Sequence, residues 1–203
     1  MGRFIEIFSF YELACVFLPC LLYLEFRAVK ERKAGRRISG VYLGWVCVFL
    51  VYLWMVFDVT GVGIVGDILR NMPDIFIGGT NFVPFDSLGM GFVLNIVMFM
   101  PFGFLAPLIF KDSRALGRTV AAGAVFSLLI ELSQIFNFRA TDVDDLIANT
   151  FGACIGYLLW YVFTKIAGER LYAASGRRWE VLRYALLAMA GVFFLYHPFL
   201  III

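Results

Sequence analysis

Charged residues are scarce in this sequence, and the marks of a soluble or secreted protein are missing. Only 16% of its 203 residues are charged and 62% are hydrophobic, whereas soluble globular domains carry about 25% charged and about 45–50% apolar residues. The N-terminal segment has neither the basic stretch nor the small-residue cleavage site of a secretory signal peptide. This composition excludes a soluble globular domain and predicts an integral membrane protein.

Residue patterns that bind metals are also missing. The sequence has no HExxH motif, and we expect its one histidine, His197, at a membrane interface. The cysteines lie inside apolar segments without a CxxC pair, and small buried hydrophobic residues are their expected role. There are four of them: Cys15, Cys20, Cys47 and Cys154. We therefore expect no cofactor, and no nucleic acid as a partner.

Long apolar runs dominate the chain instead. A helix needs about 20 apolar residues to cross the hydrocarbon core of a bilayer. Six segments qualify, at about 7–26, 41–57, 91–110, 119–137, 146–164 and 184–203. The predicted fold is an all-α, polytopic integral membrane bundle of about six transmembrane helices.

Basic residues are concentrated in alternate connections between these segments. Connections 27–40, 111–118 and 165–183 hold fourteen of the seventeen Lys and Arg residues. Because basic connections stay in the cytoplasm, these three are predicted to be cytoplasmic and both termini extracellular. In the outer connection, 58–90, apolar residues recur at helical spacing over 64–72, which predicts a short amphipathic helix on the membrane surface.

Polar residues inside the spans gather toward the predicted outer side. An ionisable residue inside a span costs about 2.5–3.5 kcal/mol, so each one is a candidate for a functional site. Glu131 and Gln134 lie in the last two turns of 119–137, and they follow Ser127 at helical spacing. The other polar residues of this kind are Asn95, Asp142, Asp145 and Asn149, together with Glu6 and Glu12 in the outer half of the first span.

The spacing of the second half of this cluster predicts a helical hairpin. Asp142, Asp145, Asn149, Gly152 and Gly156 step by three or four residues and share one helix face. Two glycines four residues apart allow membrane helices to approach closely. Segments 119–137 and 146–164 are therefore expected to face each other, with carboxylates outside and glycines deeper in the membrane.

Structural explanations exist for several of these residues. Asp142, Asp144 and Asp145 fit N-capping of the following helix, with Asp144 capping or solvated. Arg139 fits a surface pair with Asp142. Glu131 has no basic residue beside it in the sequence, and the cluster as a whole has an excess of acid. Crowded carboxylates near lipid must protonate, share protons or bind a cation, so a cationic headgroup, a metal ion at Asp142 and Asp145, or a metal-bridged glycan phosphate would fit.

The motifs together resemble the signature of VanZ-like membrane proteins. The resemblance rests on Glu131-Leu-Ser-Gln134, Arg139-x-x-Asp142-x-x-Asp145, Asn149-x-x-Gly152-x-x-x-Gly156, Asn81-Phe-Val-Pro-Phe85, and Asn95 followed by Pro101-Phe-Gly103. It divides the chain into a first helix with its basic connection (1–40), a VanZ-like core (41–165), and a second basic connection with a last helix (166–203). The resemblance implies a multi-pass protein of a bacterial plasma membrane, associated with low-level resistance to teicoplanin-type glycopeptides.

Three functions fit these observations. The first is non-enzymatic binding of an amphiphile, such as a lipid, a lipid-linked cell-wall precursor or a lipoglycopeptide, in an outer acidic pocket. The candidate ligand-binding residues are Asn95, Glu131, Gln134, Arg139, Asp142, Asp145 and Asn149, with Pro101, Gly103, Gly152 and Gly156 in structural roles. The second is a membrane-embedded enzyme with Glu131 as general base and a metal ion at Asp142 and Asp145. The third is a proton- or cation-coupled transporter. We favour the first, because the cluster has no nucleophile motif and the sequence no inverted repeats.

Overall fold

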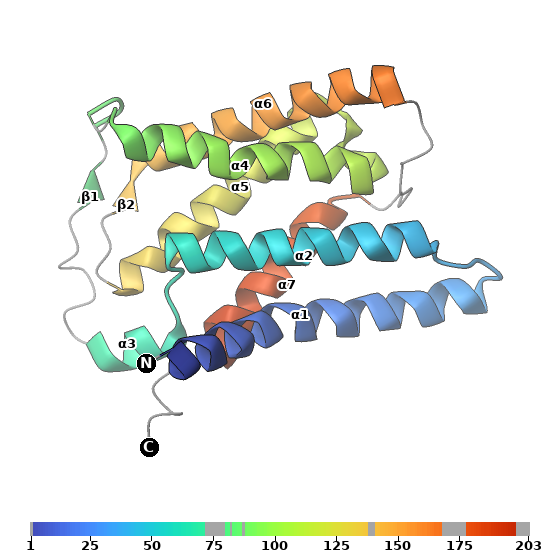
Figure 1. Cartoon of the computed structure of the whole chain (residues 1–203), viewed down its shortest axis with the longest axis horizontal. Helices are drawn as coiled ribbons and strands as arrows, with labels where there is room; N and C mark the ends of the chain where they lie inside the picture. Colours follow the sequence, from blue (N-terminus) through green and yellow to red (C-terminus); the bar gives the residue numbers. More distant parts are fainter. Residues whose placement is uncertain are drawn as a thin grey trace.

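A computed structural model describes residues 2–71, 80–81, 83–86, 88–137, 141–167 and 178–197 (Figure 1). The long helices are α1 (Gly2–Lys33), α2 (Gly40–Thr60), α4 (Met90–Ile109), α5 (Leu116–Gln134), α6 (Val143–Ala167) and α7 (Glu180–Leu195). Shorter elements are α3 (Val65–Asn71), the 3-10 helices η1 (Lys111–Arg114) and η2 (Ile135–Asn137), and the two-residue strands β1 (Thr80–Asn81) and β2 (Thr141–Asp142).

The structure confirms an all-α membrane bundle. Among the residues that the structure describes, four helical segments are long and apolar enough to cross a membrane: Gly40–Arg70, Met90–Ile109, Leu116–Asn137 and Val143–Ile166. The helices α1 and α7 occupy the positions of the first and last predicted spans, and α3 lies where the amphipathic helix was expected. Within the described ranges, the only strands are β1 and β2, which pair in parallel with Thr80 opposite Thr141 and Asn81 opposite Asp142.

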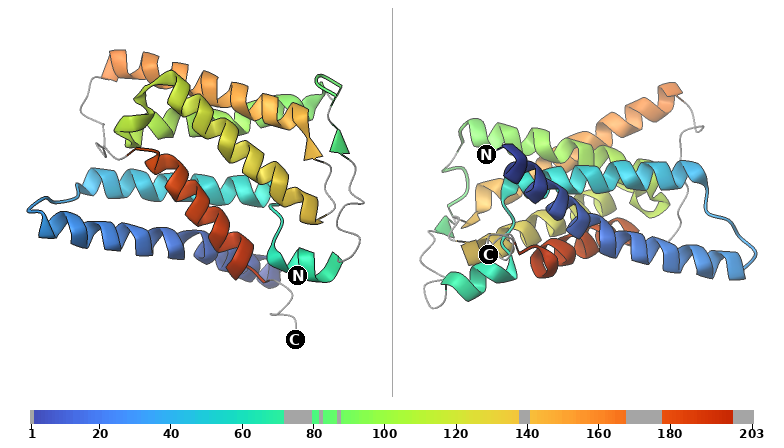
Figure 2. Two further views of the ribbon diagram at one scale, coloured as in Figure 1. Left: turned by 180° about the vertical axis from the view of Figure 1, so that it is seen from behind. Right: turned by 60° about the horizontal axis from the view of Figure 1, so that its bottom comes forward.

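The bundle has two distinct ends (Figures 1 and 2). At one end α1 begins, α7 ends, and α3, η2, β1 and β2 lie together; we call this the strand end. The opposite end, which we call the basic end, carries the connection between α1 and α2 and the 3-10 helix η1. The pairing of β1 with β2 brings the residues before Asn81-Phe-Val-Pro-Phe85 beside the start of α6. Two motifs whose paired residues, Asn81 and Asp142, are 61 positions apart in the sequence therefore meet at the strand end.

Aromatic side chains fill the core between α2, α4 and α5. Phe102 stacks on Phe126, with ring centroids 5.6 Å apart and planes 19° from parallel. Phe99 lies 5.6 Å from Phe126, and Phe49 lies 6.0 Å from Phe102. These four side chains are fully buried. Because rings in tilted or offset contact gain about 0.5–1.5 kcal/mol per pair beyond their buried area, this cluster fixes the helices that carry the polar residues.

Glycines bring α6 against α4. A Cβ atom on Gly152 would lie 2.3 Å from the carbonyl oxygen of Ile96, and one on Gly156 would lie 1.9 Å from that of Met100. Conversely, a Cβ atom on Gly103 would lie 2.0 Å from the carbonyl oxygen of Ala153. The glycines of α6 were expected to face α5. This expectation is wrong, because they face α4. The helix α4 continues through Pro101 to Ile109.

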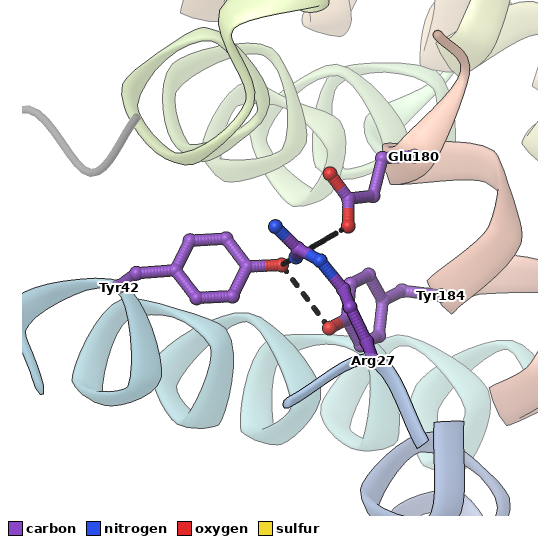
Figure 3. Close-up of polar contacts among 4 residues, drawn as sticks. All are labelled: Arg27, Tyr42, Glu180 and Tyr184. Carbon is purple, nitrogen blue, oxygen red and sulfur yellow. Dashed lines mark hydrogen bonds and ion pairs between the residues drawn. The ribbon is translucent and has the colours of Figure 1, made fainter. Parts of the chain in front are cut away.

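A buried polar network joins α1 and α7 to the core near the basic end (Figure 3). Arg27 Nη1 donates to Glu180 Oε1 and to Tyr42 Oη, both at 2.5 Å, and the hydroxyls of Tyr42 and Tyr184 are 3.1 Å apart. The guanidinium also lies over the ring of Tyr42, 4.7 Å from its centroid. Arg27 is 7% exposed and Glu180 is fully buried. The predicted connection 27–40 included Arg27, but α1 continues past this residue to Lys33.

Candidate functional site

Most of the predicted polar residues line one small cavity at the strand end. The cavity has a volume of about 250 Å³ and lies between α2, α4, α5 and α6. Its lining residues are Val59, Thr60, Asn95, Glu131, Gln134, Asp145 and Asn149. Five of the seven candidate ligand-binding residues thus meet around a single space, although they come from three helices.

Glu131 is the deepest carboxylate of the group. It lies on the last turns of α5 and is 4% exposed. Its Oε2 accepts a hydrogen bond from the backbone N–H of Asp142 at 3.2 Å. The carboxylate therefore lines the cavity and also holds the chain where it enters α6.

Asp145 and Asn95 join α6 to α4 across the cavity. Asn95 Nδ2 donates to Asp145 Oδ1 at 2.6 Å, and both side chains are partly exposed. A hydrogen bond to a carboxylate is worth about twice a neutral one. The contact thus fixes the position of one carboxylate oxygen at the cavity wall.

Asn149 presents an acceptor that no described residue satisfies. The side chain is 2% exposed, and its Nδ2 donates to Ser127 Oγ at 2.9 Å. Its Oδ1 is buried and, within the part of the chain that the structure describes, has no hydrogen-bond partner. Leaving a buried acceptor without a donor costs about 1–3 kcal/mol. A molecule that enters the cavity with an N–H or O–H group would remove this cost.

Gln134 also donates a hydrogen bond to the C-terminal end of α2. Its Nε2 donates to the backbone oxygen of Thr60 at 2.7 Å, and Asn137 Nδ2 donates to that of Gly61 at 2.8 Å. The last carbonyl groups of a helix have no partner within the helix, and here α5 and η2 supply two for α2. Gly63 permits the close approach, because a Cβ atom there would lie 2.0 Å from the carbonyl oxygen of Ser133.

Asp142 is not among the described residues that line the cavity. Asp142 Oδ1 accepts a hydrogen bond from the backbone N–H of Asp144 at 2.9 Å, at the start of α6. This is the capping role that the sequence left open for the aspartates. Arg139 lies outside the described residues. Among the residues that are described, no three or more His, Cys, Asp and Glu side chains form a group that would hold a metal ion.

Asp144 has a role that the sequence did not indicate. It is 1% exposed, and its Oδ1 accepts a hydrogen bond from the backbone N–H of Phe85 at 2.5 Å. Phe85 has a φ of 67°, which residues other than glycine adopt at a cost. Of the two alternatives for Asp144, the solvated one is therefore wrong. The only signal in the sequence was the motif Asn81-Phe-Val-Pro-Phe85, which does not show where its backbone points.

Asp144→Ala should release the loop that contains Phe85. A hydrogen bond to a charged group is worth about 1.5–3 kcal/mol, so hydrogen exchange at the Phe85 amide should become about ten- to a hundredfold faster. Asp86→Ala, an exposed carboxylate in the same loop, is the control and should leave this rate unchanged. Equal exchange rates in the wild type and in Asp144→Ala would contradict the assigned contact.

Comparisons with known proteins match the region that forms the cavity. The VanZ/LLP1 family model matches residues 42–164. The chain is also similar to Protein VanZ of Enterococcus faecium, with 36% identity over 93 residues. That similarity covers 44% of this chain and 57% of the relative, so the chain spans little more than half of the relative's length. No solved structure matches the chain.

The family match runs from the first turn of α2 to the last turns of α6, and so includes every element that lines the cavity. It confirms the resemblance drawn from the sequence motifs. The helices α1 and α7, which the network around Arg27 fastens to α2, lie outside it. This membrane protein belongs to the VanZ/LLP1 family.

Proposed function

We propose that the cavity at the strand end binds the polar head of an amphiphile in the outer leaflet. The ligand would be a lipid, a lipid-linked cell-wall precursor or a lipoglycopeptide. Through this binding, the protein would contribute to low-level resistance to glycopeptide antibiotics of the teicoplanin type. The orientation follows from the basic connections, which place the strand end outside.

One observation carries this proposal, namely the buried Asn149 Oδ1, which has no described donor and borders a cavity that two carboxylates also line. Glu131 and Asp145 contribute carboxylates, and Asn149 contributes a buried oxygen without a donor among the described residues. A ligand that suits this wall carries ammonium, hydroxyl or amide N–H groups. Lipid headgroups and the glycan or peptide of a cell-wall precursor carry such groups, and a volume of about 250 Å³ accommodates only part of such a molecule.

An apolar groove on α5 and α6 favours an amphiphile over a water-soluble molecule as the ligand. It has a volume of about 580 Å³ and belongs to the same two helices that carry Glu131 and Asp145. Its lining residues are Val120, Ala124, Val125, Leu128, Leu146, Ile147, Thr150, Phe151 and Cys154. Burial of apolar surface is worth about 25 cal/mol per Å², so an acyl chain in this groove would add to the affinity of the head.

The proposal predicts that Glu131→Gln combined with Asp145→Asn abolishes protection. Both substitutions keep the size of the side chain and remove its negative charge. In a susceptible Gram-positive host, the minimum inhibitory concentration of teicoplanin should return close to that of cells without the protein. The control is Asp58→Asn, because Asp58 is an exposed carboxylate on the last turns of α2 that does not line the cavity.

Binding and resistance are separated by a second measurement on the same variants. Lipids that accompany the detergent-purified wild-type protein should be depleted in the double variant and retained in Asp58→Asn, at equal amounts of folded protein. Full protection by the double variant at equal expression would refute the resistance role. An unchanged lipid profile would refute the assignment of the binding site.

A further inference from the structure

A second cavity lies at the basic end, between the last turns of α1 and the first turn of α2. Its volume is about 660 Å³. It is lined by Ala28, Arg32, Gly35, Arg36, Arg37, Ile38 and Leu43. Three arginines and three aliphatic side chains thus share one wall. The cavity is made almost entirely from residues before 42, outside the family match.

The backbone of the connection holds the arginines in place. Gly35 has a φ of +73°, and its N–H donates to the carbonyl of Arg32 at 3.0 Å. The N–H of Arg36 donates to the carbonyl of Glu31 at 2.9 Å. These bonds close the end of α1 and turn the chain back, so that Arg36 and Arg37 lie on the same cavity as Arg32. Ser39 then caps α2, where its Oγ accepts from the N–H of Val41.

Two of the three arginines form no ion pair with a described residue. Arg36 Nε donates to Glu31 Oε2 at 2.6 Å, which uses the one acidic residue of segment 27–40. Arg32 and Arg37 are exposed and form no ion pair among the residues that the structure describes. Six basic residues and one acid leave segment 27–40 with a net charge of +5.

The buried network of Figure 3 lies beside this cavity. Arg27 is the residue before Ala28 of the cavity wall, but its side chain points into the bundle and binds Glu180 and Tyr42. Its charge is therefore used inside the protein and is not available to the cavity. Because Tyr42 precedes Leu43 of the cavity wall, the network holds the two helices of the wall in a fixed relation.

We propose that this cavity binds the phosphate of an anionic phospholipid, in the leaflet opposite to the cavity at the strand end. Guanidinium groups bind phosphate oxygens in a bidentate geometry, which favours Arg32 and Arg37 as its partners. Ala28, Ile38 and Leu43 supply an apolar wall for the glycerol and the first methylene groups. Basic pockets between membrane helices on the cytoplasmic side are suited to such headgroups. The site is independent of the function proposed above.

The test is a titration of the detergent-purified full chain with short-chain phosphatidylglycerol. Binding is measured by native mass spectrometry and, independently, as the rise in the unfolding temperature of the protein. We expect Arg32→Gln combined with Arg37→Gln to weaken binding about 30-fold, because each basic residue near an anionic headgroup contributes about a factor of five to six, or 1 kcal/mol. The matched control is Lys30→Gln combined with Lys33→Gln, which removes the same charge from the same basic segment, 27–40, but not from the cavity wall. It should change binding only a few-fold.

Three results would overturn the proposal. Equal losses in the arginine and lysine variants would indicate a diffuse basic surface rather than a site. Equal binding of short-chain phosphatidylcholine would show that the negative charge is not recognised. Inorganic phosphate that displaces the lipid at equal concentration would show that the site takes free phosphate. The loss of binding caused by Arg32→Gln combined with Arg37→Gln should be the same in a Glu131→Gln background, which separates this site from the one at the strand end.

Discussion

Arg27→Leu is expected to destabilise the folded protein by about 3–5 kcal/mol, since it leaves the carboxylate of Glu180 buried without its basic partner. Tyr42 loses both a hydrogen bond and the cation over its ring. The measurement is the unfolding temperature of the purified protein in detergent, together with the yield of folded protein.

Two further variants make this expectation specific to the buried pair. Arg27→Leu combined with Glu180→Leu removes both charges, and it should recover most of the lost stability, because an apolar pair of similar volume often replaces a buried ion pair without cost. Arg36→Gln breaks the exposed pair with Glu31 and should leave stability unchanged. If Arg27→Leu were as mild as Arg36→Gln, the network would not contribute to stability.

The second large effect is expected from Gly156→Ala. The added Cβ atom would lie 1.9 Å from the carbonyl oxygen of Met100, and no rotation of a side chain relieves a contact with backbone. The helices α4 and α6 must therefore move apart. Overpacking of this kind costs about 1–3 kcal/mol, and we expect the upper end of that range. Unfolding temperature and resistance to protease are suitable measurements.

Gly44→Ala is the matched control for this substitution. Gly44 lies inside α2 with nothing within 4 Å of the position of a Cβ atom. Replacing an unobstructed helical glycine by alanine should stabilise the helix by about 0.5–1 kcal/mol. Opposite signs for the two variants would establish that close packing, rather than helix propensity, decides the effect at Gly156. A Gly156→Ala protein as stable as the wild type would contradict the described contact of α6 with α4.

The sequence was sufficient to predict the helices and most of the residues of the candidate site. Apolar runs and the positions of basic residues predicted helices where α1, α2, α4, α5, α6 and α7 lie. Helical spacing predicted that Glu131 and Gln134 share a face, and that Asp145 and Asn149 share another. The structure adds that both faces, with Asn95, border the same cavity.

The rest depended on relations between helices and on backbone geometry. Spacing along α6 places Gly152 and Gly156 on one face, but it does not reveal that the neighbour on that face is α4. Asp144 accepts a hydrogen bond from the backbone of Phe85, a residue with positive φ, and no periodicity encodes this loop conformation. Arg27 was grouped with the basic connection because of its charge. Glu180, with which it pairs, lies so far away in the sequence that no local pattern reveals the contact.

That distance has a consequence for how the chain is made. Arg27 and Glu180 are separated by 153 positions, so the first helix receives its counter-charge only when the last helix is synthesised. Until then, the long side chain of Arg27 must extend toward the membrane surface to remain hydrated. We therefore expect the first helix to pack into its final position late in biogenesis, after α2 to α6 have inserted into the membrane. A chain that stalls before Glu180 would lack the counter-charge of Arg27.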